Sequence, residues 1–319
     1  MPFRAPTRVM ITGATGFVGR HLAEALIRQG AEVVGLSRRR TTDKLSLGPD
    51  RPRWVCGDLH DEAWLSEVLR AARPTHVFHL AGVLPGAPGG AAAQYEANVL
   101  LTVQLLEAIH RLSLNPWIMV ASSSAVYGDM EPNEPPLSED RPFQPRSHYA
   151  VSKAAQELAA LSYTLMHRLR TVRVRSFNLI GPGQPNTLLT SHLAYQVAQA
   201  RAANMPRAVR VGNLFPRRDY VDVRDAVRAY QLLAEHETEG VFNVCSGRSV
   251  SVQECVDLLA RCCGEPLQVL IDQDRVRPQE ISIQVGDPQR LHRATGWTPA
   301  RSLEESLRDL LAYWSKTGP

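Results

Sequence analysis

The sequence predicts an α/β fold, in which a doubly wound parallel sheet is joined to a smaller mixed C-terminal domain. Two observations lead to this prediction. Short β-type runs alternate with amphipathic helical patterns through the first half of the 319 residues, and this alternation is typical of parallel α/β structure. The β-type runs are apolar along their length, as expected when helices cover both faces of a sheet.

The expected elements follow one another in a regular order. We expect strands at Arg8–Thr12, Glu32–Ser37, Trp54–Cys56, His76–Leu80, Trp117–Ser122 and Thr171–Ser176. We expect helices at Gly16–Gln29, Asp61–Ala71, Ala91–Leu112 and Tyr149–Leu169. The Pro-rich stretch Glu131–Pro145 is interpreted as an ordered surface loop, because sheet-type structure resumes after it.

The second half of the chain changes character after the Gly/Pro-rich passage Gly181–Pro185. A helical pattern follows at Ser191–Ala203, and the chain then returns to the sheet over Tyr220–Val244. Two later helices should open with capping boxes, in which a Ser and a Glu three residues on satisfy each other's backbone N–H groups. These pairs are Ser251 with Glu254 and Ser302 with Glu305.

Composition excludes several classes of protein. The hydrophobic share of 44% and charged share of 21% are ordinary for a globular protein. No run approaches the roughly 18 apolar residues of a membrane span, no signal peptide is evident, and the five cysteines lack metal-type spacing. The net charge of +4 comes from arginines spread along the whole chain. We therefore expect a cytoplasmic protein with no metal site and no nucleic-acid or membrane partner.

A glycine-rich turn lies directly between the first expected strand and the first expected helix. Its sequence is Gly13-Ala14-Thr15-Gly16-Phe17-Val18-Gly19. Such a turn lets backbone N–H groups and the helix dipole face a pyrophosphate, which Cβ atoms would block. An ordinary tight turn is the alternative. The strand-turn-helix context favours a Rossmann-type dinucleotide site at Gly13, Thr15, Gly16, Phe17 and Val18.

The ends of the next strands indicate which dinucleotide is bound. An NAD enzyme usually has a carboxylate about 20 residues beyond the glycines, whereas Ser37 and Arg38 stand there, followed by two more arginines. Guanidinium groups pair well with phosphate, so NADP(H) is the expected cofactor and NAD(H) the alternative. Three solvated arginines on a loop would also explain the pattern. Further expected cofactor contacts are Asp58 and Leu59 after the third strand and Leu80, Ala81 and Gly82 after the fourth.

A tyrosine and a lysine, Tyr149 and Lys153, stand four residues apart in an expected helix and so share one face. The ammonium should favour the phenolate, which would let Tyr149 exchange a proton near neutral pH. A surface pair without a role is the alternative. Upstream, Ser122, Ser123 and Ser124 close the fifth strand, where side chains project into the ligand crevice of a parallel sheet. A serine-rich turn without a role would look the same.

The glycine turn, the serines before Val126-Tyr127-Gly128, and Tyr149 with Lys153 together resemble the extended short-chain dehydrogenases/reductases. This family acts on nucleotide sugars as epimerases, dehydratases and reductases. The resemblance implies that Ser123 is the catalytic hydroxyl, Tyr149 the acid/base and Lys153 its partner, and that Tyr149 and Lys153 both contact the cofactor. It also implies that Ser123 and Ser124 contact the substrate. Asn98 falls where the family has a structural Asn, with a helix-surface amide as the alternative.

Parts of the second half resemble one branch of this family, the GDP-4-keto-6-deoxymannose reductases. The matching segments are Arg175–Gln184, Val211–Leu214, Arg218–Val223, Phe242–Gly247 and Thr295–Trp297. The resemblance implies that Asn178 and Arg218 contact the sugar-nucleotide pyrophosphate, that Val211 lines the base pocket, and that Arg277 and Glu280 lie near the nucleotide. Surface ion pairs are the alternative for the two arginines. Dehydratases of this fold follow the catalytic Thr with Asp-Glu, whereas Ser124 and Ala125 stand here.

The expected activity is therefore NADPH-dependent reduction of the C4 keto group of a GDP-4-keto-6-deoxyhexose, giving a GDP-6-deoxyhexose such as GDP-D-rhamnose. An NAD-dependent 4-epimerase and a non-catalytic NADP-binding sensor are the alternatives. The expected domains are residues 1–177 plus 219–245 for NADP and residues 178–218 plus 246–319 for the nucleotide sugar. By analogy with many relatives, the helices at Ala91–Leu112 and Tyr149–Leu169 would form a four-helix homodimer interface.

Overall fold

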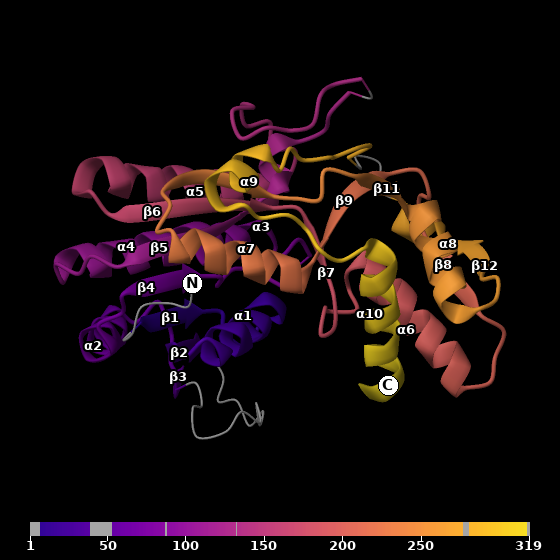
Figure 1. Cartoon of the computed structure of the whole chain (residues 1–319), viewed down its shortest axis with the longest axis horizontal. Coiled ribbons are helices and arrows are strands. Elements are labelled where there is room, and N and C mark those ends of the chain that lie inside the picture. The colour runs from indigo at the N-terminus through magenta and orange to yellow at the C-terminus, as the bar shows by residue number, and fades with distance from the viewer. Residues whose placement is uncertain (1–6, 39–52, 87, 132, 277–280, 318–319) are drawn as a thin grey trace.

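The structure is a computed structural model that describes residues 7–38, 53–86, 88–131, 133–276 and 281–317. Its centre is a sheet of seven parallel strands in the order β10-β6-β5-β4-β1-β2-β3 (Figure 1). The strands are β1 Arg8–Thr12, β2 Glu32–Ser37, β3 Arg53–Cys56, β4 His76–His79, β5 Trp117–Ser123, β6 Arg170–Ser176 and β10 Gly240–Val244. The predicted doubly wound parallel sheet is confirmed.

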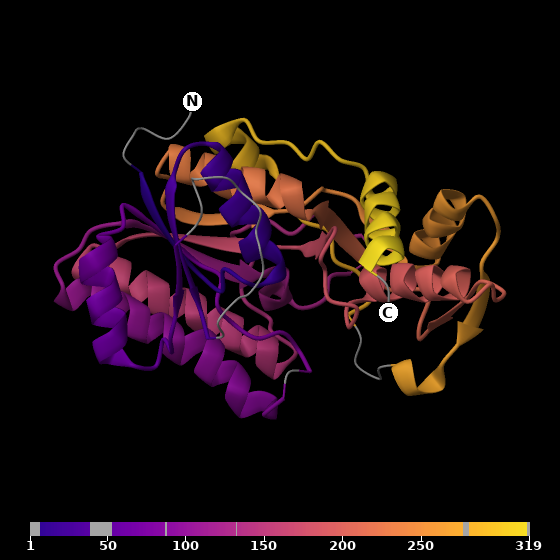
Figure 2. The ribbon, with the colours of Figure 1, turned by 90° about the horizontal axis from the view of Figure 1, so that it is seen from below.

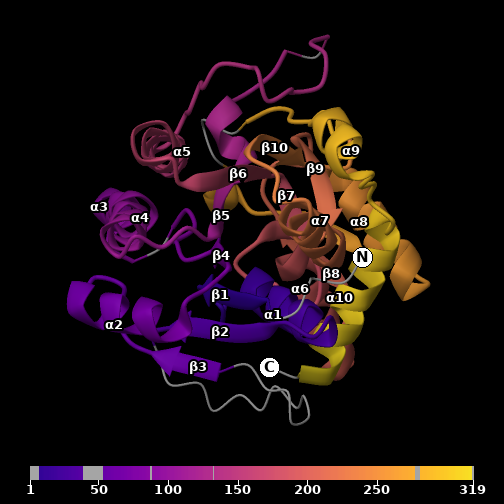
Figure 3. The same cartoon turned by 60° about the vertical axis from the view of Figure 1, so that its left-hand side comes forward.

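Helices cover both faces of this sheet, which explains why its strands are apolar along their length. One face carries α2, α4 and α5, and the other carries α1 and α7 (Figure 3). Their bounds are α1 Phe17–Arg28, α2 Glu62–Ala72, α4 Leu101–Arg111, α5 His148–His167 and α7 Val223–Glu235. Leu22 and Tyr230 belong to the apolar core on the α1 face, and Leu65 and Leu105 to the core on the α2 face.

The strand order reverses between β1 and β4, because β2 and β3 extend the sheet to one side and β5 and β6 to the other. In open α/β sheets, ligands bind outside the carboxyl ends of the strands at such a reversal. The glycine turn follows β1, and Ala81 and Gly82 follow β4. The topology therefore brings two of the predicted cofactor segments to the same point.

The helix predicted over Ala91–Leu112 is present without a break, but it is not α-helical throughout. It consists of α3 Gly90–Tyr95, a π-helical turn at Glu96–Leu100, and α4. The π turn contains Asn98, which is fully buried and bonded to the backbone of Val83 and to Ser152. Single π turns inside α-helices are frequent at functional sites. The helical periodicity of the sequence does not reveal the contacts that the Asn98 amide makes with distant residues.

The second half of the chain builds a smaller body beside the sheet (Figure 2). It contains a three-stranded sheet, β11-β9-β7, a two-stranded sheet, β12-β8, and helices that share one apolar core. The elements are β7 Asn178–Ile180, α6 Leu189–Ala202, β8 Ala208–Val211, β9 Arg217–Asp222, β11 Ser249–Ser251, α8 Val252–Cys263, β12 Gln268–Ile271 and α10 Leu303–Thr317. Short helices α9 Gln289–Thr295, η2 Ser124–Tyr127 and η3 Gln273–Arg275 complete the fold.

Both predicted capping boxes are present. The Ser251 hydroxyl accepts from Glu254 N at 3.1 Å, and the Glu254 carboxylate accepts from Ser251 N at 2.6 Å. Ser302 and Glu305 repeat this exchange at 3.2 and 2.7 Å. The expected return to the large sheet over Tyr220–Val244 is confirmed for β10 alone. The first residues of this span belong to β9, which is part of the three-stranded sheet.

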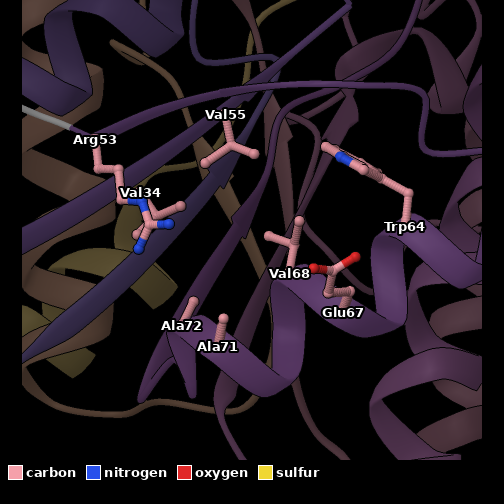
Figure 4. Close-up of a pocket in the computed structure, with 8 residues that line it drawn as sticks. All are labelled: Val34, Arg53, Val55, Trp64, Glu67, Val68, Ala71 and Ala72. Atoms are coloured by element: carbon pink, nitrogen blue, oxygen red, sulfur yellow. The ribbon is translucent and has the colours of Figure 1, made fainter.

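A cavity of about 190 Å³ lies between α2 and the strands β2 and β3 (Figure 4). It is lined by Val34, Arg53, Val55, Trp64, Glu67, Val68, Ala71 and Ala72. None of these is a predicted site residue; the predicted site residues of the large sheet lie at its strand ends. Among the residues that the structure describes, no helix is both long and apolar enough to cross a membrane.

Candidate active site

The glycine turn forms a cradle that a side chain would fill. Gly13 has a φ of +69°, and a Cβ there would lie 2.8 Å from Ala81 N. A Cβ on Gly19 would lie 2.4 Å from Gly13 O. Helix α1 starts at Phe17 with Gly16 as its N-cap and no side-chain cap, so its first N–H groups face a possible anion without a competing carboxylate or hydroxyl cap. This geometry fits a dinucleotide pyrophosphate.

The start of α1 also contacts the segment that follows β7. The ring of Phe17 lies 3.9 Å from the position of a Cβ on Gly181, and His21 Nε2 is 2.8 Å from Pro182 O. Val18 packs against the core on the α1 face, and the Thr15 carbonyl accepts from Arg20 Nε at 2.9 Å. The turn is therefore held from both bodies of the fold.

The other predicted cofactor residues lie at neighbouring strand ends. Ser37 ends β2, and the exposed Arg38 follows it; Arg39 and Arg40 lie outside the described residues. Asp58 is exposed, and its Oδ1 accepts from His60 N at 3.0 Å. The Leu59 side chain is buried in the core, so only its backbone is available to a ligand. Leu80 and Ala81 are half-buried, and Gly82 is exposed.

A serine cap sets the position of the tyrosine and lysine. The Ser147 hydroxyl accepts from Ala150 N at 3.1 Å, so α5 begins at His148. Tyr149 then stands in the first turn and Lys153 one turn later on the same face. Ser123 caps the short helix η2 and also hydrogen bonds to Tyr149. The structure thus brings Ser123 and Tyr149 into contact.

Burial raises the pKa of Tyr149 above its usual range, although the hydrogen bond with Ser123 acts in the opposite direction. The prediction that Lys153 favours the phenolate is therefore wrong for this structure. The Lys153 ammonium donates instead to Ala121 O at 2.8 Å and to Gln156 Oε1 at 2.9 Å. Tyr149 keeps its proton near neutral pH, which makes it a proton donor.

Lys153 is itself buried, and this burial lowers the pKa of its ammonium to about 8 against the opposing charge of Glu157. Gly82 leaves space beside it, because a Cβ there would lie 3.6 Å from Lys153 Nζ and 2.5 Å from Asn98 Oδ1. Asn98 accepts from Val83 N at 3.0 Å and donates to Ser152 Oγ at 2.9 Å. The alternative of a helix-surface amide is therefore wrong for Asn98.

The three serines at the end of β5 have different partners. The Ser122 hydroxyl donates to Glu157, and the Ser124 hydroxyl donates to Gln284 Oε1 at 3.3 Å. Both serines are buried, whereas Ser123 is half-buried. Of the predicted substrate serines, Ser123 is the one joined to Tyr149, and the Ser124 hydroxyl is already engaged.

The predicted substrate residues are only partly brought together. Ser123 pairs with Ser176 across the sheet, so Asn178 lies just beyond the strand end that carries Ser123. Asn178 on β7 donates to Asp219 O at 3.1 Å and is in register with Tyr220 on β9, two residues after Arg218. The Val211 side chain packs in the core of the smaller body and is 2% exposed. Arg277 and Glu280 lie outside the described residues.

Sequence reasoning missed a buried ion pair behind the serines. Arg175 on β6 and Glu157 on α5 join at 2.9 Å, with side chains 6% and 3% exposed. Arg175 also donates to the Tyr127 hydroxyl at 2.9 Å and to Glu139 O at 3.0 Å. One signal could have revealed Glu157, because it stands four residues after Lys153 on the same helix face. Nothing in the sequence marks its partner Arg175 as buried.

A second missed residue is Gln284, which is 3% exposed. Its amide donates to Ser124 O at 3.2 Å and to Gly128 O at 2.5 Å, across more than 150 residues of chain. It therefore ties the serine segment to the stretch of chain between β12 and α9. No cluster of three or more metal-binding side chains occurs within the described part of the chain.

Comparison with known proteins finds relatives that align with nearly the whole chain. The family model for GDP-mannose 4,6 dehydratase matches residues 10–310. The GDP-6-deoxy-D-mannose reductase of Pseudomonas aeruginosa is 33% identical over 310 residues, covering 96% of this chain and 97% of the relative.

Two solved structures share the fold over nearly their whole length. RMD from Pseudomonas aeruginosa complexed with NADPH is 30% identical, with a TM-score of 0.82 and coverage of 98% of this chain and 100% of that one. The UDP-glucose 4-epimerase of Thermus thermophilus in complex with NAD is 28% identical, with a TM-score of 0.86 and the same coverage. From its matched family model, its relatives and its site, the chain belongs to the GDP-mannose 4,6-dehydratase family of extended short-chain dehydrogenases/reductases.

Proposed function

We propose that the protein reduces the C4 keto group of a GDP-4-keto-6-deoxyhexose with NADPH, giving a GDP-6-deoxyhexose such as GDP-D-rhamnose. The observation that carries this proposal is the hydrogen bond between Tyr149 and Ser123 at the end of β5. Reduction of a ketone leaves negative charge on its oxygen, which needs a proton donor and a hydrogen bond. Tyr149 donates the proton, and the Ser123 hydroxyl donates a hydrogen bond to the same oxygen.

The residues at the dehydratase acid/base positions support reduction over dehydration. Ser124 and Ala125 stand where dehydratases of this fold have Asp-Glu. Ser124 is bonded to Gln284, and the nearby carboxylate of Glu157 is paired with Arg175. Neither position supplies a carboxyl group to protonate and expel a C6 hydroxyl. The proposed substrate is therefore a sugar that has already been dehydrated.

The strand-end residues support NADP(H) as the cofactor. NADPH, when bound, supplies the hydride. Gly13 and the uncapped start of α1 would hold its pyrophosphate, and Lys153 beside Gly82 would hold the nicotinamide ribose. Arg38 would pair with the 2′-phosphate at the end of β2. The NADPH complex of the 30% identical Pseudomonas aeruginosa protein supports this assignment.

Replacing Arg38 by Ala is expected to weaken NADPH binding by about tenfold or more, the scale of one charge-assisted phosphate contact. NADH lacks the 2′-phosphate, so its dissociation constant should not change. Both constants can be measured by fluorescence titration of the wild type and the variant. Equal affinities of the wild type for NADPH and NADH would contradict the role of Arg38.

The proposed reaction is tested by following NADPH oxidation over a panel of GDP-, UDP- and dTDP-linked 4-keto-6-deoxy sugars. We expect turnover with the GDP-linked sugar and net consumption of NADPH. A 4-epimerase would interconvert sugars without net consumption, and a sensor would bind NADPH without turnover. In competition, GDP should inhibit at lower concentration than UDP or dTDP; tighter binding of either would refute the choice of nucleotide but not the reduction.

We also propose a homodimer formed through α5. Val151, Leu158 and Leu165 are 37%, 54% and 74% exposed and seven residues apart, so they form one apolar stripe. Replacing both Leu158 and Leu165 by Glu should convert a dimer of 35.3 kDa chains into a monomer, as measured by light scattering. Phe215→Glu is the control, because Phe215 is 86% exposed but lies outside the stripe. A wild-type monomer would contradict the proposal.

A cytoplasmic location fits the thiols. All five cysteines, Cys56, Cys245, Cys255, Cys262 and Cys263, are free in the structure. Adjacent Cys262 and Cys263 are only partly buried, and such thiols remain reduced in a cytosol that keeps glutathione reduced. We expect thiol titration of the freshly isolated, denatured protein to find five free thiols.

A further inference from the structure

Buried side chains form a continuous series of hydrogen bonds between the glycine turn and Lys153. Thr12 Oγ1 is 2.7 Å from His79 Nδ1, and His79 Nε2 is 2.9 Å from Thr102 Oγ1. Gln156 Nε2 donates to Thr102 Oγ1 at 2.8 Å, and Gln156 Oε1 accepts from Lys153 Nζ at 2.9 Å. Thr12, His79, Thr102 and Gln156 are each 0% exposed. We refer to these four residues as the buried chain.

One assignment of protons satisfies every member of the buried chain. Thr102 donates its own proton to Asn98 O at 2.8 Å, so its oxygen accepts from both Gln156 and His79. His79 therefore carries its proton on Nε2, and its Nδ1 accepts from the Thr12 hydroxyl. The Thr12 oxygen in turn accepts from Ala81 N at 3.1 Å. Each bond thus fixes the direction of the next.

The buried chain ends at the Lys153 ammonium and helps to fix the direction of its N–H donors. An ammonium has three N–H donors, and Ala121 O and Gln156 Oε1 each accept one from Lys153. Because the donors are arranged tetrahedrally, fixing two of them fixes the third. The Gln156 amide cannot rotate freely to release its acceptor, since its nitrogen is bonded to Thr102.

Charged and titratable groups reach Lys153 from three elements. The charge of Glu157 on α5 raises the pKa of Lys153, and the Glu157 carboxylate also forms an ion pair with Arg175 on β6. His79 of β4 is neutral, because burial and the charge of Lys153 lower its pKa to about 3. Tyr149 of α5 is protonated. Gln156 adds a dipole that favours the charged ammonium, since a hydrogen bond to the charged form stabilises it.

We infer that Gln156, anchored by Thr102 and His79, is a positioning residue that sets both the direction and the protonation of the Lys153 ammonium. The inference rests on the proposed function for the role of Lys153, but its contacts do not depend on the substrate. An apolar side chain at position 156 removes the dipole and should lower the pKa of Lys153. A carboxylate there should raise it.

The scarcity of lysine makes the inference directly measurable. The chain has three lysines, Lys44, Lys153 and Lys316, so a protein labelled with carbon-13 at the lysine ε-carbons gives three signals. Lys153→Arg identifies the signal of Lys153. We expect it to titrate near pH 8 in the wild type, about one unit lower in Gln156→Met and about one unit higher in Gln156→Glu. Thr102→Val should shift it in the same direction as Gln156→Met, by less.

The direction of the shift separates positioning from mere loss of packing. A loosened site admits water and would raise the pKa of a buried lysine, so a fall in Gln156→Met cannot come from loosening. Thr164→Val is the matched control, because Thr164 on α5 bonds to Thr171 at 2.6 Å and not to the buried chain. If Gln156→Met does not fold, Thr102→Val tests the same direction.

The inference would be overturned if Lys153 had the same pKa in the wild type, Gln156→Met and Gln156→Glu. A higher pKa of Lys153 in Gln156→Met than in the wild type would also overturn it. The titration uses free protein without a sugar nucleotide, so it is independent of the reductase assay. Opposite shifts in the two Gln156 variants, together with no turnover of any sugar by the wild type, would uphold the positioning role and contradict the proposed function.

Discussion

Replacing Tyr149 by Phe is expected to lower the rate of NADPH-dependent reduction by several orders of magnitude and to leave NADPH binding nearly unchanged. The phenol is needed when charge develops on the substrate oxygen, not when the cofactor binds. Its raised pKa means that the phenol holds the proton it must give. Steady-state rates and NADPH titrations of the same preparations separate the two effects.

Two further variants define the scale of the Tyr149 effect. Ser123→Ala should cost less, on the order of 10²-fold in turnover, because one hydrogen bond to the developing charge is lost. Tyr163→Phe is the matched control: it lies on the same helix, and its hydroxyl donates to Glu107 at 2.9 Å, away from Ser123. A Tyr149→Phe enzyme as active as Tyr163→Phe would refute the assignment of the acid.

Replacing Glu157 by Leu is expected to destabilise the fold by ~3–5 kcal/mol, because it leaves the guanidinium of Arg175 buried without its carboxylate. The pair is almost completely excluded from solvent, and within the described part of the chain Arg175 donates to no other carboxylate. Urea unfolding measures the loss as a lower midpoint at similar slope.

An exposed ion pair provides the comparison. Glu24 and Arg28 on α1 are 3.5 Å apart with side chains 35% and 68% exposed, so Glu24→Leu should change stability by no more than about 1 kcal/mol. The double replacement Glu157→Leu with Arg175→Met should recover much of the loss, since apolar residues of similar volume often replace a buried pair without cost. Equal losses in Glu157→Leu and Glu24→Leu would show that burial does not decide the effect.

Local patterns predicted much of the fold and part of the site. Apolar runs predict the first six strands of the large sheet, and the spacing of Ser and Glu predicts the two capping boxes. The glycine turn and the Tyr149–Lys153 pair also depend on spacing within one turn or one helix. The structure places the turn after β1 and the pair on α5 beside the end of β5, with β4 between these two strands. The roles given to these residues remain predictions until variants are measured.

What the sequence could not reveal depends on contacts between distant segments. The expectation that Lys153 favours a Tyr149 phenolate is wrong because it rests on these two residues alone. In the structure the Lys153 ammonium bonds to Ala121 O and Gln156. Helical periodicity does not signal the π turn at Glu96–Leu100 or the buried partners of Asn98. Val211 resembles a pocket residue by its position in a motif, yet its side chain completes a core that the motif does not describe.

The place of β10 at the sheet edge has a consequence for how the chain is made. This strand pairs with β6, although some sixty residues, including β7, α6, β8, β9 and α7, separate the two in the chain. Its Asn243 also accepts from the hydroxyl of Tyr127 at 2.7 Å, and Tyr127 follows the three serines at the end of β5. A ribosome releases the chain from its N-terminus. Until residue 244 emerges, β6 presents an open edge, the kind of surface on which nascent chains associate wrongly.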